Sequence, residues 1–97
     1  MPALLITLVQ VKDPAKMQQY SAAAGPTIVA AGGVVLGRGK QVEVLAGAID
    51  LHAALVARFP SAQAAHDWYH GAAYQALVPL RDEAMAPTFF VLDEPPA

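Results

Sequence analysis

The side chains best suited to chemistry gather between residues 59 and 81 of this 97-residue chain. The stretch FPSAQAAHDWYHGAAYQALVPLR contains the only tryptophan, two of the three tyrosines, two of the three histidines and a terminal arginine. Aromatic rings with polar tips, imidazoles and a guanidinium are typical of ligand pockets, where apolar walls hold a molecule and a few polar groups orient it. The stretch therefore predicts a pocket wall, but it specifies neither a reaction nor a substrate.

A histidine pair within this stretch is a candidate metal site. His66 and His70 are four residues apart on an expected helix, so their rings lie on one side of it and can hold a metal ion. Two ligands make a weak site, however, and solvent-exposed helix histidines are common. A neutral His66 acting as a general base is a further open interpretation. We expect no metal and no cofactor.

Basic side chains on the expected strands are stronger candidates for ligand binding. His52 and Arg58 share one face of a strand, and a buried arginine there needs an anionic partner, because an unpaired buried charge is costly. Arg58 therefore either anchors a ligand or pairs at the strand end with a carboxylate, Glu43 or Asp93. Arg38, between two glycines, either reaches a ligand carboxylate or crosses a subunit interface.

The aromatic residues also have two interpretations. Trp68 and Tyr69 either anchor the helix to the sheet, which is the common role of large aromatics, or form a surface on which a ligand stacks. The candidate ligand-binding residues are Tyr20, Arg38, His52, Arg58, His66, Trp68 and Tyr69. We assign none of them a catalytic role, and whether the protein is an enzyme stays open.

Composition excludes several classes of function. Apolar residues make up 56% of the chain and charged residues 14%, and the net charge is −2. Because no basic run is present, we expect neither a nucleic-acid nor a membrane partner. The absence of cysteine excludes disulfides and thiolate chemistry. The apolar N-terminus is too short to cross a bilayer and has no leader pattern, so we expect a cytoplasmic protein with one domain over residues 1–97.

The elements that position these residues follow from apolar periodicity, caps and breakers. We expect a helix from Asp13-Pro14, interrupted at Gly25-Pro26 and ended by Gly32-Gly33, and a second helical segment capped by Ser61, divided at Gly71 and restarted at Pro79. The expected strands span residues 4–11, 34–36, 42–45, 51–59 and 88–92, with a bulge or turn at 37–40 that makes the second and third of these one bent strand or ribbon.

The resulting order, β-α-β-β-α-β, predicts the ferredoxin-like α+β fold with an antiparallel sheet. Helices then cover one face of the sheet only. Because the strands are apolar on both parities, the other face must also be buried, and the same face of a second copy is the simplest cover. The sequence predicts a homodimer. It leaves open whether odd-numbered or even-numbered residues of strand 51–59 meet the helices.

Several spaced signals together resemble the domain-of-unknown-function 1330 family of small bacterial proteins. They are Asp13-Pro14, Tyr20, Gly32-Gly33, Gly37-Arg38-Gly39, Val42-Glu43-Val44-Leu45, Phe59-Pro60-Ser61, Trp68-Tyr69, Tyr74-Gln75 and Arg81. The resemblance spans nearly the whole chain, with departures at residues 70–73 and at Pro79. It implies a ferredoxin-like subunit of a dimeric α+β barrel, and it implies no established reaction.

Two classes of function follow. The first is binding of a small, mostly apolar molecule with a carboxylate or carbonyl in a cleft between helices and sheet, with cofactor-free catalysis as an option. The second is a non-catalytic dimeric interaction module, in which the same aromatics fill the core and the polar residues form interface pairs. A walled cavity lined by an unpaired basic group favours the first class, and a filled core favours the second.

Overall fold

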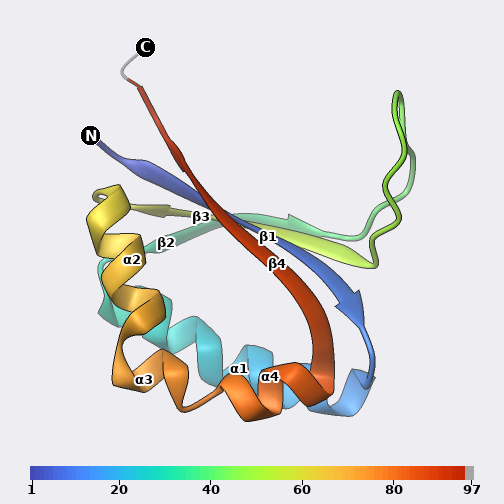
Figure 1. Ribbon diagram of the computed structural model, residues 1–97, viewed down its shortest axis with the longest axis horizontal. Helices are drawn as coiled ribbons and strands as arrows, with labels where there is room; N and C mark the ends of the chain where they lie inside the picture. The colour runs from blue at the N-terminus through green and yellow to red at the C-terminus, as the bar shows by residue number, and fades with distance from the viewer. Residues whose placement is uncertain (96–97) are drawn as a thin grey trace.

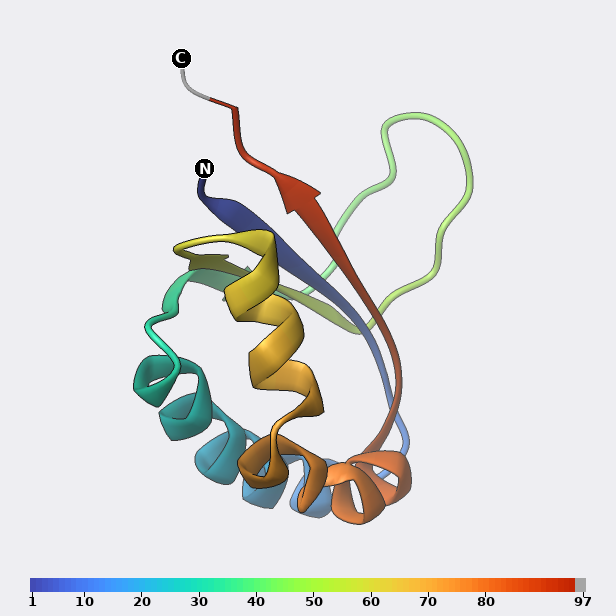
Figure 2. The same cartoon turned by 60° about the vertical axis from the view of Figure 1, so that its left-hand side comes forward.

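The computed structural model describes residues 1–95 and shows a four-stranded antiparallel sheet with helices α1 to α4 on one face (Figures 1 and 2). The strand order is β2-β3-β1-β4, so the first and third strands are central. This is the ferredoxin-like β-α-β-β-α-β fold that the sequence predicts. The elements are β1 (Ala3–Val11), α1 (Pro14–Ala30), β2 (Val34–Gly39), β3 (Ala53–Phe59), α2 (Ala62–His70), α3 (Ala72–Gln75), α4 (Val78–Ala84) and β4 (Met85–Asp93).

Residue parity along the central strands decides which face of the sheet meets the helices. The odd-numbered residues of β1 from Ala3 to Val9 are buried, whereas the even-numbered residues between them are partly exposed. Ala57 and Phe59 of β3 are fully buried on the same side. The odd-numbered face therefore lies under the helices, and the even-numbered face is open. This settles the alternative that the sequence left undecided.

The long helix α1 begins and ends where the sequence predicts. The Asp13 carboxylate accepts hydrogen bonds from the backbone N–H groups of Ala15 and Lys16, and Gly32 adopts a φ of 86° just beyond the last turn. Beyond Gly25-Pro26 the sequence allows either a short turn or a kinked continuation of the helix, and the structure shows a continuation, because α1 is one 17-residue helix that contains Pro26. The preceding glycine lacks the Cβ that would clash with the proline ring, so the helix continues.

The second helical segment follows its predicted divisions. The Ser61 hydroxyl accepts a hydrogen bond from the Ala64 backbone N–H and caps α2. Gly71 separates α2 from α3, and α4 restarts at Val78 with Pro79 in its first turn. These breaks let three short helices change direction while they stay on the same side of the sheet (Figure 2).

The segment between β2 and β3 departs from the prediction. The glycine-rich residues 37–39 stay in β2, and the register shift falls between Val35 and Gly37. The predicted strand 42–45 is wrong, because residues 40–52 form an irregular arm that extends away from the sheet (Figure 1). Val42 and Leu45 on the arm are 95% and 88% exposed, so neither packing nor strand pairing within the chain orders them as a strand.

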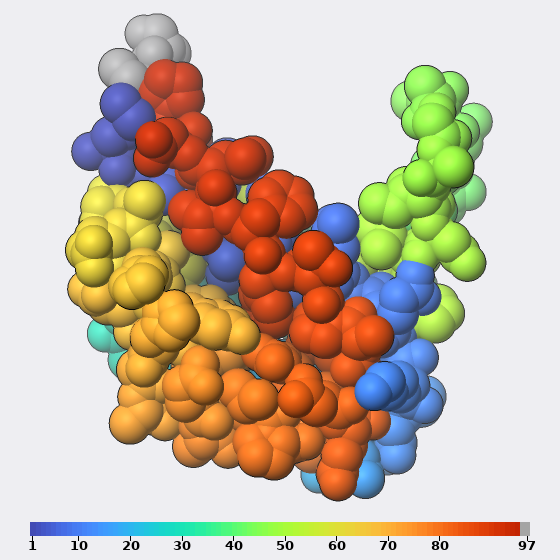
Figure 3. Space-filling model, in the orientation of Figure 1, coloured from blue at the N-terminus to red at the C-terminus, as the bar shows by residue number. Residues whose placement is uncertain are grey.

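The open face of the sheet remains apolar. Val34, Phe90 and Leu92 are 58%, 40% and 47% exposed, and Leu4 and Ile6 of the central strand are half-buried beside them. A space-filling view shows the arm and the two chain ends rising on opposite sides of the molecule, with a hollow between them (Figure 3). Among residues 1–95, no helix is long and apolar enough to cross a membrane.

A substitution at Gly33 tests how closely the end of α1 packs against the sheet. A Cβ on Gly33 would lie 2.7 Å from Ile28 Cγ2 and 3.0 Å from Phe59 Cε1. We therefore expect Gly33→Ala to lower the free energy of unfolding by about 1–3 kcal/mol, as overpacking does. Gly37→Ala is the matched control, because nothing lies within 4 Å of its Cβ. Urea unfolding measures both variants, and equal effects would contradict this account of the packing.

Candidate functional site

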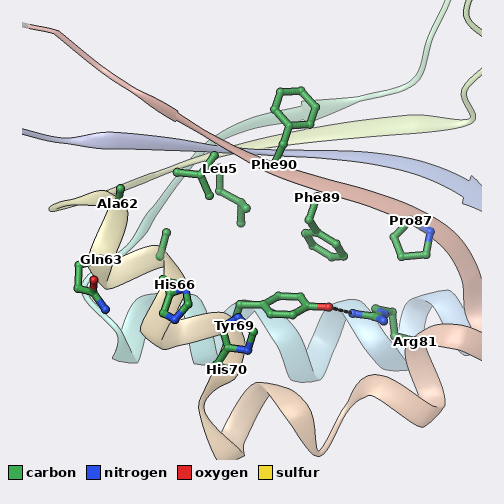
Figure 4. Close-up of a pocket in the computed structure, with 12 residues that line it drawn as sticks. Leu5, Ala62, Gln63, His66, Tyr69, His70, Arg81, Pro87, Phe89 and Phe90 are labelled. Atoms are coloured by element: carbon green, nitrogen blue, oxygen red, sulfur yellow. Dashed lines mark hydrogen bonds between the residues drawn. The ribbon is translucent and has the colours of Figure 1, made fainter.

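A cavity of about 710 Å³ lies between α2 and the edge strand β4 (Figure 4). We call it the α2/β4 pocket. Ser61 starts α2, and the helical repeat then places Ala65 and Trp68 against the sheet and residues 62, 66 and 69 along the pocket. Its chemically informative lining residues are His66, Tyr69, His70, Arg81, Pro87 and Phe89.

A buried network of hydroxyl groups lies behind the pocket and, through Arg81, joins four helices. The Tyr20 hydroxyl of α1 and the Tyr74 hydroxyl of α3 are 2.6 Å apart. Arg81 Nη1 of α4 donates to the Tyr69 hydroxyl at 3.0 Å and to the Tyr74 hydroxyl at 3.5 Å. Tyr20 is 6% exposed and Tyr74 is fully buried, so these polar groups depend on one another for hydrogen bonding.

Arg81 is the dominant charge of the pocket. Its side chain is 11% exposed, and its Nε atom donates to the Asp82 carboxylate at 3.1 Å. Burial opposes the charged form, but the hydrogen bonds to Tyr74, Tyr69 and Asp82 outweigh it and raise the pKa of Arg81. The guanidinium is therefore always protonated.

One end of this guanidinium has no protein partner. Arg81 Nη2 makes no hydrogen bond to residues 1–95. Every enclosed side-chain nitrogen or oxygen in the described part of the chain has a partner, so the unpaired Nη2 is not fully enclosed. Arg81 is also one of the residues that line the α2/β4 pocket.

Aromatic rings form the apolar part of the pocket. The Arg81 guanidinium carbon lies 5.6 Å from the Phe89 ring centroid and 5.9 Å from that of Tyr69. Figure 4 shows the Phe89 ring turned toward Tyr69, whereas Phe90 points to the opposite side of the sheet. The two ring centroids are themselves 5.7 Å apart, so both rings lie on the same side of the guanidinium. Phe89 is within cation–π range of it, whereas Tyr69 holds it through the hydrogen bond to the phenol oxygen.

The histidine pair lies at the other end of the pocket. The rings of His66 and His70 are 4.4 Å apart between centroids, and both residues are exposed. Among residues 1–95, no group of three or more His, Cys, Asp or Glu side chains is arranged to hold a metal ion. The pair supplies hydrogen-bonding groups at the mouth of the pocket.

Comparison with known proteins places the chain in a family. The family model described as Domain of unknown function (DUF1330) matches residues 2–95. The chain belongs to the DUF1330 family. No curated protein matches it. The family assignment confirms the resemblance seen in the sequence and supplies no reaction.

Solved structures share the fold of this DUF1330 protein. A protein of unknown function from Rhodopseudomonas palustris is 20% identical, with 99% of this chain and 84% of that chain covered and a TM-score of 0.81. A dimeric ferredoxin-like protein of unknown function from Bacteroides fragilis is 12% identical over 96% of each chain, with a TM-score of 0.67. SnoaB, a cofactor-independent oxygenase from Streptomyces nogalater, is 9% identical over 99% of this chain and 95% of its own, with a TM-score of 0.72. At these identities the likeness establishes the fold alone.

The structure brings together some of the residues that the sequence singled out. His66 and Tyr69 line the α2/β4 pocket. Tyr20 joins the network behind it. Trp68 is 6% exposed and donates from Nε1 to the Thr27 hydroxyl at 3.0 Å, so it is a packing anchor between α2 and α1. Arg38 borders a second, smaller cavity beneath α1.

Two predicted residues lie away from the pocket. Arg58 is on the even-numbered, open face of β3, and its Nε and Nη2 donate to the two carboxylate oxygens of Glu94 at 2.7 Å. The partner of Arg58 is thus neither Glu43 nor Asp93. Because the Arg58 side chain lies on the face of the sheet opposite the helices, it does not reach a ligand in this pocket. The His52 Nδ1 atom accepts a hydrogen bond from the Val11 backbone N–H at 2.7 Å, which joins two strand ends.

Sequence reasoning missed Arg81, Tyr74 and Phe89 as site residues. Arg81 and Tyr74 are among the spaced residues that resemble the family, and this is the one sequence feature that could have identified them as site residues. Their distance from Tyr69 depends on the turns at Gly71 and Pro79, however, and spacing along the chain does not specify those turns. Phe89 stands on a strand whose apolar pattern is continuous, so nothing in the sequence separates it from its neighbours.

The buried Tyr20 makes the free energy of unfolding decrease at alkaline pH. Burial, followed by the hydrogen bond to Tyr74, raises the pKa of Tyr20 above its ordinary value near 10. The folded state therefore keeps this proton when the unfolded chain loses it, and the free energy of unfolding falls by about 1.4 kcal/mol per pH unit above pH 10.

Urea unfolding between about pH 8 and 11 measures this effect. We expect Tyr20→Phe to be less stable at neutral pH, because it leaves the Tyr74 hydroxyl without its partner, but to lose the alkaline slope that Tyr20 contributes. A variant that retains the whole wild-type slope would show that Tyr20 is not its source.

Proposed function

We propose that this DUF1330 protein binds a small, mostly apolar organic molecule that carries a carboxylate or carbonyl, in the α2/β4 pocket. The observation that carries the proposal is the Arg81 guanidinium, which is largely buried, is held by two phenols, makes no hydrogen bond through Nη2 to residues 1–95, and belongs to a residue that lines a cavity of about 710 Å³. A buried cation with a free donor lowers the cost of desolvating an anionic or carbonyl oxygen.

The shape and lining of the pocket support the same ligand class. Its volume falls in the range of small-molecule sites, and Tyr69 and Phe89 provide apolar aromatic contacts next to the guanidinium. His66 and His70 at the mouth can donate to or accept from a second polar group of the ligand. An interaction module without a ligand site would instead be expected to fill this space with side chains.

We further propose that the protein acts as a homodimer through the open face of its sheet. The exposed apolar side chains Val34, Phe90 and Leu92 there have no cover within residues 1–95. A two-fold copy buries this face against itself, and a stable interface needs about 800 Å² per subunit. The dimeric state of the Bacteroides fragilis structure with the same fold supports this arrangement.

The ligand proposal is tested with matched carboxylates and amides. Benzoate, phenylacetate and cinnamate are titrated beside their neutral amides by calorimetry. We expect the carboxylates to bind and Arg81→Gln to weaken them by about 10- to 100-fold, the scale of a charge-assisted hydrogen bond, while binding of the amides changes less. Arg58→Gln is the control, because it removes an arginine paired on the opposite face of the sheet.

Two results would overturn the ligand proposal. One is the absence of binding across these carboxylates and a set of medium-chain fatty acids. The other is an equal loss of affinity in Arg58→Gln and Arg81→Gln, which would assign the effect to net charge. Circular dichroism of each variant separates a loss of ligand affinity from a loss of fold.

The dimer proposal is tested by sedimentation equilibrium at micromolar concentration. We expect twice the chain mass of 10.1 kDa. Ile6→Glu places a charge in the centre of the open face and should give a folded monomer, because burying an unpaired carboxylate is costly. Val29→Glu, at a site on α1 that is 68% exposed, should remain dimeric. A wild-type monomer would contradict the proposal.

A further inference from the structure

A second cavity, of about 150 Å³, lies between α1 and the helix-facing side of the sheet. It is separate from the α2/β4 pocket, although Leu5 and Phe89 form part of the wall of both. Its lining is mainly apolar, and Ala24 of α1 is 6% exposed within it. The residues that give it chemical character are Thr7, Tyr20, Ser21, Arg38 and Trp68.

Thr7 is the unusual residue of this cavity. It lies on β1 between the buried Leu5 and Val9, is 6% exposed, and is the only polar residue among the buried residues of the described chain. Its hydroxyl makes no hydrogen bond to residues 1–95, and because no enclosed polar side-chain atom there lacks a partner, the hydroxyl must face the cavity. An isosteric valine would avoid the cost of burying an unpaired hydroxyl, which is about 1–3 kcal/mol.

The other polar groups limit the charge of an occupant. The Tyr20 hydroxyl is already bound to Tyr74. No carboxylate lines the cavity, and the one basic lining residue, Arg38, is exposed on β2. A cation would therefore be desolvated beside Thr7 without a counter-charge, which is costly, and an anion there would have only the exposed Arg38 of the outermost strand to pair with. An uncharged molecule with one hydrogen-bonding group matches the interior.

The volume limits the size of the occupant. An apolar protein cavity of about 150 Å³ accommodates one benzene molecule. A six-membered ring that bears a single hydroxyl fits this volume and brings one polar atom to the Thr7 hydroxyl, which can both donate and accept. Larger amphipathic molecules are excluded unless the walls move.

We propose that this cavity is a second binding site, for a compact uncharged ring compound of the phenol class whose hydroxyl pairs with Thr7 Oγ1. The site uses neither Arg81 nor the α2/β4 pocket, so it stands independently of the proposed function. Its ligand differs from that of the first pocket in being neutral and smaller.

Trp68 provides the readout, because the single tryptophan of the chain lines this second cavity and not the α2/β4 pocket. Phenol and toluene are titrated while tryptophan emission is recorded. We expect both to bind, with Thr7→Val weakening phenol by about three- to tenfold, the worth of one neutral hydrogen bond, and leaving toluene unchanged.

Two further variants locate the binding. Ala24→Leu fills the cavity and should abolish the response to both probes, and Ser21→Leu on the same helix serves if the first variant fails to fold. Arg81→Gln should leave phenol affinity unchanged. The proposal is overturned if phenol causes no tryptophan response, if Thr7→Val weakens phenol and toluene equally or neither, or if Arg81→Gln abolishes phenol binding.

Discussion

The hydrogen bond between the hydroxyls of Tyr20 and Tyr74 is the contact on which the helical layer depends. It joins α1 to α3 in a region where both phenols are buried, so each hydroxyl has its partner only while the two helices stay in register. Arg81 extends the connection to α4 and α2 through its bonds to Tyr74 and Tyr69. Four helical segments that contact the sheet separately are thereby held as one layer.

The same network separates the two cavities and gives each its chemistry. Tyr69 and Arg81 face the α2/β4 pocket, whereas Tyr20 lines the smaller cavity beneath α1. The first cavity is cationic because a guanidinium is largely buried at its end, whereas the only charged residue that lines the second, Arg38, is exposed. The two binding sites that we propose therefore lie on the same side of the sheet and differ in charge.

The other face of the sheet serves a different purpose. Its ion pair between Arg58 and Glu94 lies beside apolar side chains that remain exposed, and the arm of residues 40–52 extends past its edge. Within the arm, Gln41 bonds to the backbone of Ile49 and Leu51, so the arm keeps a defined course without strand pairing. The ligand sites and the subunit contact that we propose therefore lie on opposite faces of one sheet.

The sequence by itself determined the order of elements, the caps at Asp13 and Ser61, the breaks at Gly71 and Pro79, and the family, because these features depend on near neighbours along the chain. It also located the pocket wall in residues 59–81. Only the tertiary structure decided which face of the sheet is covered, since strands apolar on both parities allow either choice. Because the even-numbered face is the open one, Arg58 lies on the opposite side of the sheet from the pocket. The tertiary structure also identified Arg81 as the candidate anchor for a ligand. Arg81 approaches Tyr69 only because the short helices α3 and α4 change the direction of the chain between them.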